Sequence, residues 1–176
     1  MTSVVSLHDG PAASFDAPFD MLEACHERVE RMLGLLERLG KHLDTHGADD
    51  QARQAARDVM GYFETAAPHH HEDEERHVLP QLRALGLAAL ADRLQGDHHT
   101  MIAAWSAVRG VLQEIARGQW PPCCPASTAV QWSEFVALYR AHIAVEEEQA
   151  FRAALPHFDA AALRAMGAEM AHRRGG

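Results

Sequence analysis

Apolar side chains recur every three or four positions through most of the chain, a spacing that gathers them on one face of an α-helix. The first such stretch begins at Asp16, just before Pro18, and ends near residue 46, before Gly47. Proline is favoured in the first turn of a helix and glycine just past its end, so both boundaries have a physical reason. The inward positions of this helix are Leu22, His26, Val29, Leu33, Leu36 and Leu43.

A second helical stretch runs from about Asp49 to Leu85 and contains Pro68. Because proline removes a backbone donor inside a helix, we expect a kink one turn before the histidine run that follows. The segment LAALADRL after Gly86 predicts a short helical turn. The inner face of the second stretch is marked by Val59, Phe63, His70, Glu74, Val78, Leu82 and Leu85.

Two further long helices complete the pattern. Asp97 is the expected N-cap of the third helix, which stops at Gly118, and the proline-rich segment GQWPPCCPAS then predicts a loop. The fourth helix begins near residues 127–128 and is closed by Pro156, and residues 159–172 predict a short fifth helix. The inward positions are His98, Met101, Ile102, Trp105, Val108, Leu112 and Ile115 in the third helix, and Phe135, Leu138, Tyr139, His142, Val145 and Glu146 in the fourth.

No segment alternates apolar and polar residues as a half-buried strand would. Four long amphipathic helices with short connections predict an all-α fold, an antiparallel up-down-up-down four-helix bundle with a short C-terminal helix. We expect one bundle domain over residues 16–172, preceded by a flexible leader at residues 1–15, because a chain of 176 residues suits a single core.

Composition narrows the partners and the location. The formal charge of −9 disfavours nucleic acid and anionic membranes, because both bind basic surfaces. No stretch approaches the roughly 18 apolar residues of a membrane span, and the N-terminus lacks the pattern of a signal peptide. Cys25, Cys123 and Cys124 are an odd set that builds no disulfide framework and fits a reducing compartment. We therefore expect a cytoplasmic protein.

Helical phase decides which of the 13 histidines face the core. His98 shares its face with a core stripe, whereas the neighbouring His99 lies about 100° away around the helix. The same test favours His70 over His69, which shares its face with charged residues. The phase leaves His71 open, either as an extra ligand or as a group that orients the ligands.

Acidic residues crowd beside two of the inward histidines. Glu74 and Glu146 follow His70 and His142 by four positions, the spacing at which two side chains lie together on one helix face. Other carboxylates nearby are interpreted as a solvated face. Within it, Glu75 or Glu147 is left open as a group that orients the ligands, and Glu30 as a group that orients or binds a metal. The carboxylates of this face are Glu30, Glu72, Asp73, Glu75, Glu147 and Glu148.

Carboxylates that face a core need compensating positive charge, and metal ions supply it. Imidazole and carboxylate donors without thiolate suit iron, manganese or zinc. Six ligands, two of them glutamates, suit two ions better than one, with two histidines on each ion and each glutamate as a bridge. Availability and redox chemistry favour iron. The predicted ligands are His26, His70, Glu74, His98, His142 and Glu146.

These motifs resemble the hemerythrin-like, HHE cation-binding family over about residues 16–155. The resemblance implies a four-helix bundle with two non-haem iron ions, oxo- or hydroxo-bridged, four histidines as terminal ligands and both glutamates as bridges. It rests on His70 to Glu74 followed by Glu75 and Pro80, on His142 to Glu146 followed by EEQAF, and on His26 and Asp97-His98.

One position differs from the oxygen-carrying hemerythrins, which have a second histidine four residues after the first on helix three. That position is Ile102 in this chain. The resemblance is therefore closer to the four-histidine branch of the family, which includes iron–sulfur repair proteins and an iron-sensing domain. It implies a more open position on one iron and disfavours simple reversible oxygen transport.

Three functions fit these residues. The first is a module that binds or senses oxygen, nitric oxide or iron. The second is an enzyme that reduces oxygen, peroxide or nitric oxide with electrons from a donor protein. The third is a structural bundle that tolerates metal, which the number of polar groups it would bury disfavours. The expected partners are accordingly a small diatomic ligand or peroxide and an electron-donor protein, with no nucleic acid and no membrane.

Overall fold

The computed structural model describes residues 14–120 and 125–175, and every regular element within them is a helix. The all-α prediction is therefore confirmed. Cys123, Cys124 and residues 1–13 of the expected leader lie outside the described residues. Among the helices described, none combines the length and the apolar run that a membrane span requires.

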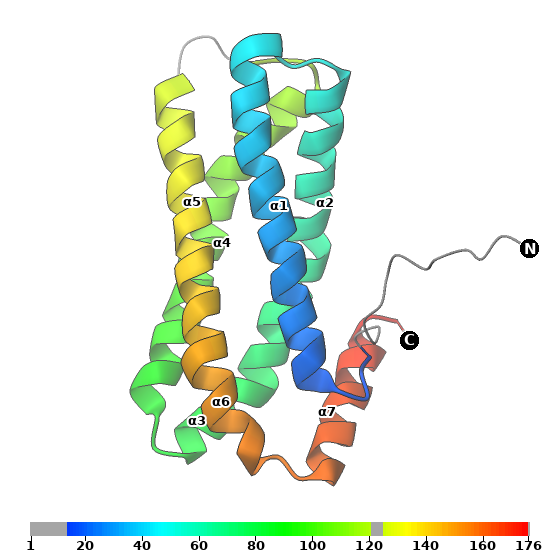
Figure 1. Ribbon diagram of the computed structural model, residues 1–176, viewed down its shortest axis with the longest axis vertical. Coiled ribbons are helices and arrows are strands. Elements are labelled where there is room, and N and C mark those ends of the chain that lie inside the picture. The colour runs from blue at the N-terminus through cyan, green and yellow to red at the C-terminus, as the bar shows by residue number, and fades with distance from the viewer. Residues whose placement is uncertain (1–13, 121–124, 176) are drawn as a thin grey trace, which may run out of the picture.

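Within the described residues, four long helices form the body of the molecule: α1 (Pro18–His46), α2 (Asp50–Asp73), α4 (Ala88–Ala116) and α5 (Pro125–Val145). α1 packs on α2, α2 on α4, α4 on α5, and α5 packs back on α1, so the four enclose a common core (Figure 1). Short elements cover one end: η1 (Glu74–Val78), α3 (Leu79–Ala84), η2 (Glu146–Ala150), α6 (Phe151–Ala154), η3 (Leu155–His157) and α7 (Ala160–Arg173).

In the part of the chain that the structure describes, two apolar clusters make up the core. The larger one holds residues such as Leu36, Phe63 and Phe135, and the smaller one holds Leu79 and Phe151 near the end that α7 covers. Along each long helix, the change from one cluster to the other falls beside an inward-facing histidine or glutamate. The fold therefore places one polar layer between two apolar layers.

The boundaries of the first and fifth helices agree closely with the prediction. α1 has its proline in the first turn and ends before Gly47, which has a positive φ of 66°. α7 is capped by Asp159, whose side chain accepts a hydrogen bond from the Ala162 amide. The predicted fourth helix is α5. It begins at Pro125, slightly before the expected start, because proline fits the first position of a helix.

The predicted start of the third helix is wrong. α4 begins at Ala88 and runs without a break through Gly96 and Asp97, so Asp97 is no N-cap. Ala91 and Leu94 are fully buried, and this packing outweighs the cost of one glycine in a helix, about 1 kcal/mol. The short turn expected after Gly86 is the first part of the same helix.

The predicted inward direction of Ile102 is also wrong, since its side chain is 63% exposed. The buried positions of α4 follow a stripe that includes Leu94, His98, Met101 and Val108. Ile102 lies about 100° beyond Met101 around the helix and falls off this stripe.

Candidate metal centre

The six predicted ligands come from all four long helical segments and are all buried, each at most 3% exposed. Helical phase also separated the neighbouring histidines correctly, since His98 is buried beside an exposed His99, and His70 is buried beside a half-buried His69. The six are His26 on α1, His70 on α2, Glu74 at the start of η1, His98 on α4, His142 on α5 and Glu146 at the start of η2.

These side chains form two groups that could each hold a metal ion. Within each group, one nitrogen or oxygen from every residue lies within 4.8 Å of the others. Both glutamates belong to both groups, whereas each histidine belongs to one. The first group is His26, His70, Glu74 and Glu146, and the second is Glu74, His98, His142 and Glu146.

Each of the two glutamates divides its oxygens between the groups. Glu74 Oε1 lies 3.1 Å from His70 Nε2, and its Oε2 lies 3.4 Å from His98 Nε2. Glu146 Oε2 lies 3.2 Å from His26 Nε2, and its Oε1 lies 3.1 Å from His142 Nε2. Two ligand atoms about 2.1 Å from one ion and at right angles around it are about 3 Å apart, so these separations suit shared ions.

Several of these atoms are buried without a hydrogen-bond partner, although they lie close together. They include His26 Nε2, Glu146 Oε2 and both carboxylate oxygens of Glu74. A buried polar atom without a partner costs about 1–3 kcal/mol, and more when it is charged. A cation between the histidines and the carboxylates would satisfy all of them at once, so the donor set fits metal.

Carboxylates outside the two groups contact the Nδ1 atoms of three of the histidines, on the side of each ring away from the group. Glu75 Oε1 lies 2.8 Å from His98 Nδ1, and Glu147 Oε1 lies 2.9 Å from His26 Nδ1. The expectation that one of these glutamates orients the rings is therefore confirmed for both. A proton held on Nδ1 by a carboxylate directs the free pair of Nε2 inward, as in many metal sites. Asp97, which the sequence placed at a helix start, lies 3.4 Å from His142 Nδ1.

Both shared glutamates begin a π-helical segment, η1 and η2. A π segment adds a residue to the helical turn and changes the direction of the side chains that follow. In each case the shared glutamate is followed by a glutamate that holds a histidine on another helix, His98 for η1 and His26 for η2. The regular spacing of the sequence indicated no such segment, and the likeness of the two acidic runs was the one available signal.

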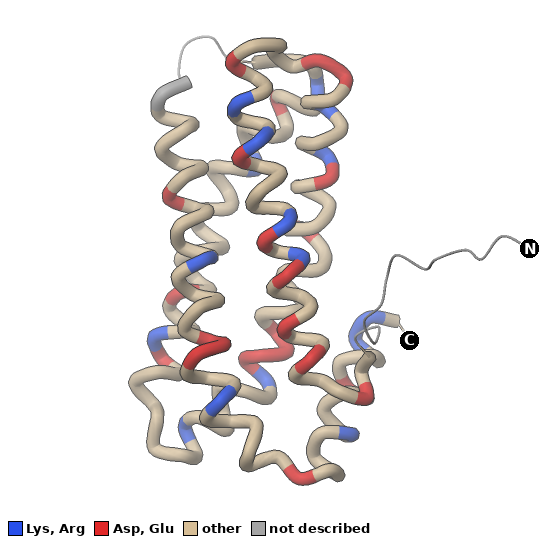
Figure 2. Tube along the Cα trace, in the orientation of Figure 1, with Lys and Arg blue, Asp and Glu red and all other residues tan. Residues whose placement is uncertain are grey.

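The buried charges favour cations. Burial lowers the pKa of His26, but the carboxylates of Glu146 and Glu74 outweigh it and raise that pKa to about 11. Burial also lowers the pKa of His98, but the carboxylates, Glu74 before Glu146, outweigh it and raise that pKa to about 9. Burial raises the pKa of Glu146, but His142 and His26 hold it well below its usual range. Glu146 therefore stays ionised. Figure 2 shows the acidic residues of η1 and η2 in the lower half of the bundle.

His71, whose role the sequence left open, lies beside the second group. Its side chain is 8% exposed, and its ring is stacked on that of His98 with centroids 4.2 Å apart. Burial, followed by the charges of His98 and His142, lowers its pKa to about 3. His71 is therefore a neutral imidazole that packs on His98 of the second group. It comes from α2, whereas the outward-facing Ile102 belongs to α4.

Two of the carboxylates expected on a solvated face differ in their surroundings. Glu30 is partly exposed, lies outside both groups and pairs with Arg140 at 3.2 Å, as the solvated-face interpretation predicts. Asp73 is fully buried, which corrects that interpretation. It contacts Arg173 and Arg174 at the end of α7, an ion pair between residues too distant in the sequence for helical phase to detect.

An all-helical fold around two buried groups of histidine and glutamate defines the molecule as a helical bundle with candidate metal sites. Comparison with known proteins agrees. The chain matches the hemerythrin HHE cation-binding domain over residues 17–154 and belongs to that family. It is also similar to an uncharacterized protein of Haemophilus influenzae, at 30% identity over 164 residues that cover 92% of each chain.

Proposed function

We propose that this chain is a di-iron protein, an antiparallel up-down bundle that binds or senses oxygen, nitric oxide or iron. The observation that carries the proposal is the orientation of two carboxylates, each of which directs one oxygen toward each histidine pair. In this arrangement His26 and His70 would hold one iron, His98 and His142 the other, and both glutamates would bridge.

The surroundings of the groups support this function. Nitrogen and oxygen donors without thiolate suit iron, and non-haem iron supplies electrons to oxygen, peroxide or nitric oxide. The chain itself positions the ligands through Glu75 and Glu147 and excludes water through the apolar clusters on both sides. Its buried carboxylates balance the charge of the ions.

Metal analysis and absorption spectroscopy of protein from iron-supplemented cells test the proposal. We expect two irons per chain and the near-ultraviolet absorption of a bridged pair. Glu146→Ala removes a ligand shared by both groups and should leave less than one iron. Glu148→Ala, which changes an exposed residue of the same π-helical segment, should leave both irons in place. Zinc in place of iron, or two irons in Glu146→Ala, would contradict the proposal.

A second experiment separates binding from catalysis. We expect reduced, iron-loaded protein to take up about one equivalent of nitric oxide or oxygen per centre and then stop. Consumption of many equivalents of oxygen, nitric oxide or peroxide in the presence of a reductant would identify a redox enzyme. Measurement of the gas or peroxide remaining in solution distinguishes these outcomes.

A further inference from the structure

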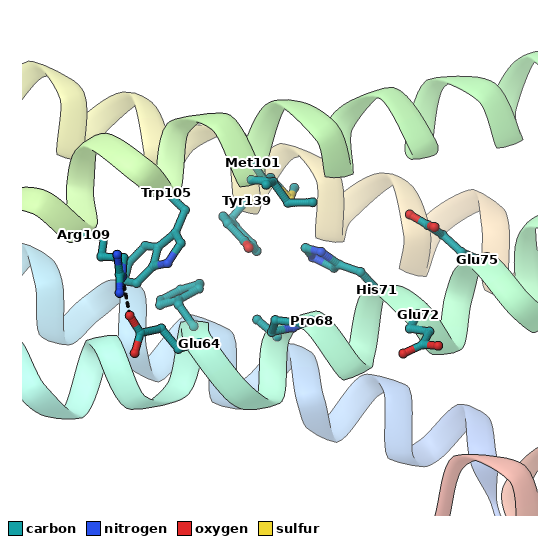
Figure 3. Close-up of a pocket in the computed structure, with 12 residues that line it drawn as sticks. Glu64, Pro68, His71, Glu72, Glu75, Met101, Trp105, Arg109 and Tyr139 are labelled. Atoms are coloured by element: carbon teal, nitrogen blue, oxygen red, sulfur yellow. Dashed lines mark hydrogen bonds and ion pairs between the residues drawn. The ribbon is translucent and has the colours of Figure 1, made fainter. Parts of the chain in front are cut away.

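A cavity of about 570 Å³ lies between α2, α4 and α5, next to the second histidine group. We call it the aromatic pocket, and its walls are formed mainly by Phe63, Ala67, Pro68, Met101, Trp105 and Tyr139. The ring of His71 reaches from α2 toward Met101 and Tyr139 at one end, and Trp105 lies toward the other (Figure 3). The volume falls in the range of pockets for organic molecules, roughly 300–1,000 Å³, and is far larger than a diatomic gas needs.

His71 provides a polar group at the inner end of this pocket. It lines the cavity and is 92% buried, and its Nε2 has no hydrogen-bond partner. A buried imidazole nitrogen without a partner is costly, and a ligand atom that donates to it or accepts from it removes that cost. The other face of the same ring is stacked on His98.

The charged side chains at the rim disfavour an anionic ligand. Arg109 Nε lies 2.5 Å from Glu64 Oε1, so the charge of this guanidinium is already paired. Glu72 pairs with Arg76, and Glu75 holds His98. The lining thus contains three carboxylates and one arginine that is already paired, and a ligand carboxylate or phosphate would meet no free cation among these residues.

We propose that the aromatic pocket binds a neutral, ring-containing organic molecule with one hydrogen-bonding atom, which pairs with His71 Nε2. The ring of this molecule would pack against Phe63, Trp105 and Tyr139, because aromatic pairs favour offset and edge-to-face contacts. This site goes beyond the proposed function, since its binding requires no metal. The bound molecule would lie one side chain from the second histidine group, separated from His98 by the ring of His71.

Titration calorimetry of the full chain with 4-methylphenol tests the proposal in both metal-free and iron-loaded protein. We expect one molecule per chain with a Kd below about 1 mM, which eight non-hydrogen atoms in a suitable pocket can reach. 4-Methylbenzoate has the same ring and an added negative charge, and it should bind at least tenfold more weakly. Failure of 4-methylphenol to bind both forms of the protein, or equal binding of the benzoate, would overturn the proposal.

Variants assign the binding to this pocket. Ile102→Trp places a large ring at the rim from an exposed position and should weaken binding at least tenfold. Ala103→Trp adds the same ring at the next exposed position of α4, outside the lining, and should leave the Kd unchanged. His71→Phe keeps a stacked ring without the nitrogen and should weaken binding roughly three- to tenfold, the usual effect of one lost hydrogen bond. An unchanged Kd in both Ile102→Trp and His71→Phe would overturn the assignment. Because the metal-free protein is tested as well, the binding of 4-methylphenol can be interpreted even if the di-iron proposal fails.

Discussion

At the residue scale, the polar layer depends on carboxylates that contact histidines from two directions. Glu74 and Glu146 face the Nε2 atoms, while Glu75 and Glu147 hold Nδ1 atoms from the outside. The outer carboxylates are more exposed than the inner pair; Glu147, for example, is 44% exposed. The outer pair can therefore be changed without opening the core.

Glu147→Gln tests this outer contact at His26. An amide in place of the carboxylate weakens the hold on the Nδ1 proton, so the ring loses its fixed orientation and basicity. We expect the affinity for metal in the first group to fall about 10- to 100-fold, measured by competition with a chelator. Glu148→Gln is the matched control on the same segment and should leave the affinity unchanged. Equal affinities in both variants would show that the contact at His26 does no positioning.

At the element scale, α7 secures the end of the bundle. Asp73, the residue before the shared Glu74, is fully buried and contacts Arg173 and Arg174 of this helix. The match to the hemerythrin family ends at residue 154, before α7 begins. α7 is therefore an addition to the matched region that neutralises a carboxylate beside the candidate metal centre.

Removal of both arginines tests the role of α7. Arg173→Ala together with Arg174→Ala leaves Asp73 buried without a partner, and we expect the free energy of unfolding to fall by about 3–5 kcal/mol. Asp73→Asn added to this double variant should recover part of the loss, because it removes the uncompensated charge. Arg164→Ala changes an exposed arginine of the same helix and should have an effect within about 0.5 kcal/mol. Urea denaturation measures all three, and a double variant as stable as the native chain would contradict the prediction.

Two helical glycines should respond in opposite directions to alanine. A Cβ at Gly110 of α4 meets nothing within 4 Å, so Gly110→Ala should stabilise the protein by roughly 0.5–1 kcal/mol through helix propensity. A Cβ at Gly167 of α7 would lie 1.8 Å from the Phe15 carbonyl oxygen. Gly167→Ala should therefore destabilise the protein by about 1–3 kcal/mol, the usual cost of overpacking. Thermal unfolding of both variants checks the signs, and a stabilising Gly167→Ala would show that α7 does not pack closely on Phe15.

At the scale of the whole molecule, two apolar clusters enclose a layer of histidines and glutamates, and protons and metal ions compete for that layer. In metal-free protein, His26 and His98 keep their protons because their pKa values are raised to about 11 and about 9. Metal ligands must be deprotonated, so binding of ions releases these protons. Metal affinity and stability are therefore linked through pH.

The sign of this linkage can be worked out from the two raised pKa values. Both groups stabilise the metal-free fold fully below pH about 6.5, the unfolded value, and this stabilisation is lost as the pH rises through about 9 for His98 and about 11 for His26. Over the same range the protons that compete with metal are lost, so metal affinity rises. We expect the difference in Tm between iron-loaded and metal-free protein to increase from pH 6.5 to 9. A difference in Tm that decreases as the pH rises would contradict the raised pKa values of His26 and His98.

The sequence by itself determined most of the helices and most of the residues that face inward, although not the start of α4 or the direction of Ile102. The 3.6-residue period fixes the direction of each side chain on its own helix, so His26, His70, His98 and His142 could be selected without a structure. The i, i+4 spacing likewise placed Glu74 beside His70 and Glu146 beside His142. These are local relations, and local backbone geometry is sufficient to predict them.

The tertiary structure decided what depends on contacts between distant segments. The shared orientation of the two glutamates requires four helices to meet at one level, and the burial of Asp73 requires α7 to return to the end of α2. The unbroken course of α4 through Gly96 follows from packing that outweighs helix propensity. The aromatic pocket exists because three helices leave space beside His71. Such features arise between residues far apart in the chain, and no periodicity along the sequence encodes their distances.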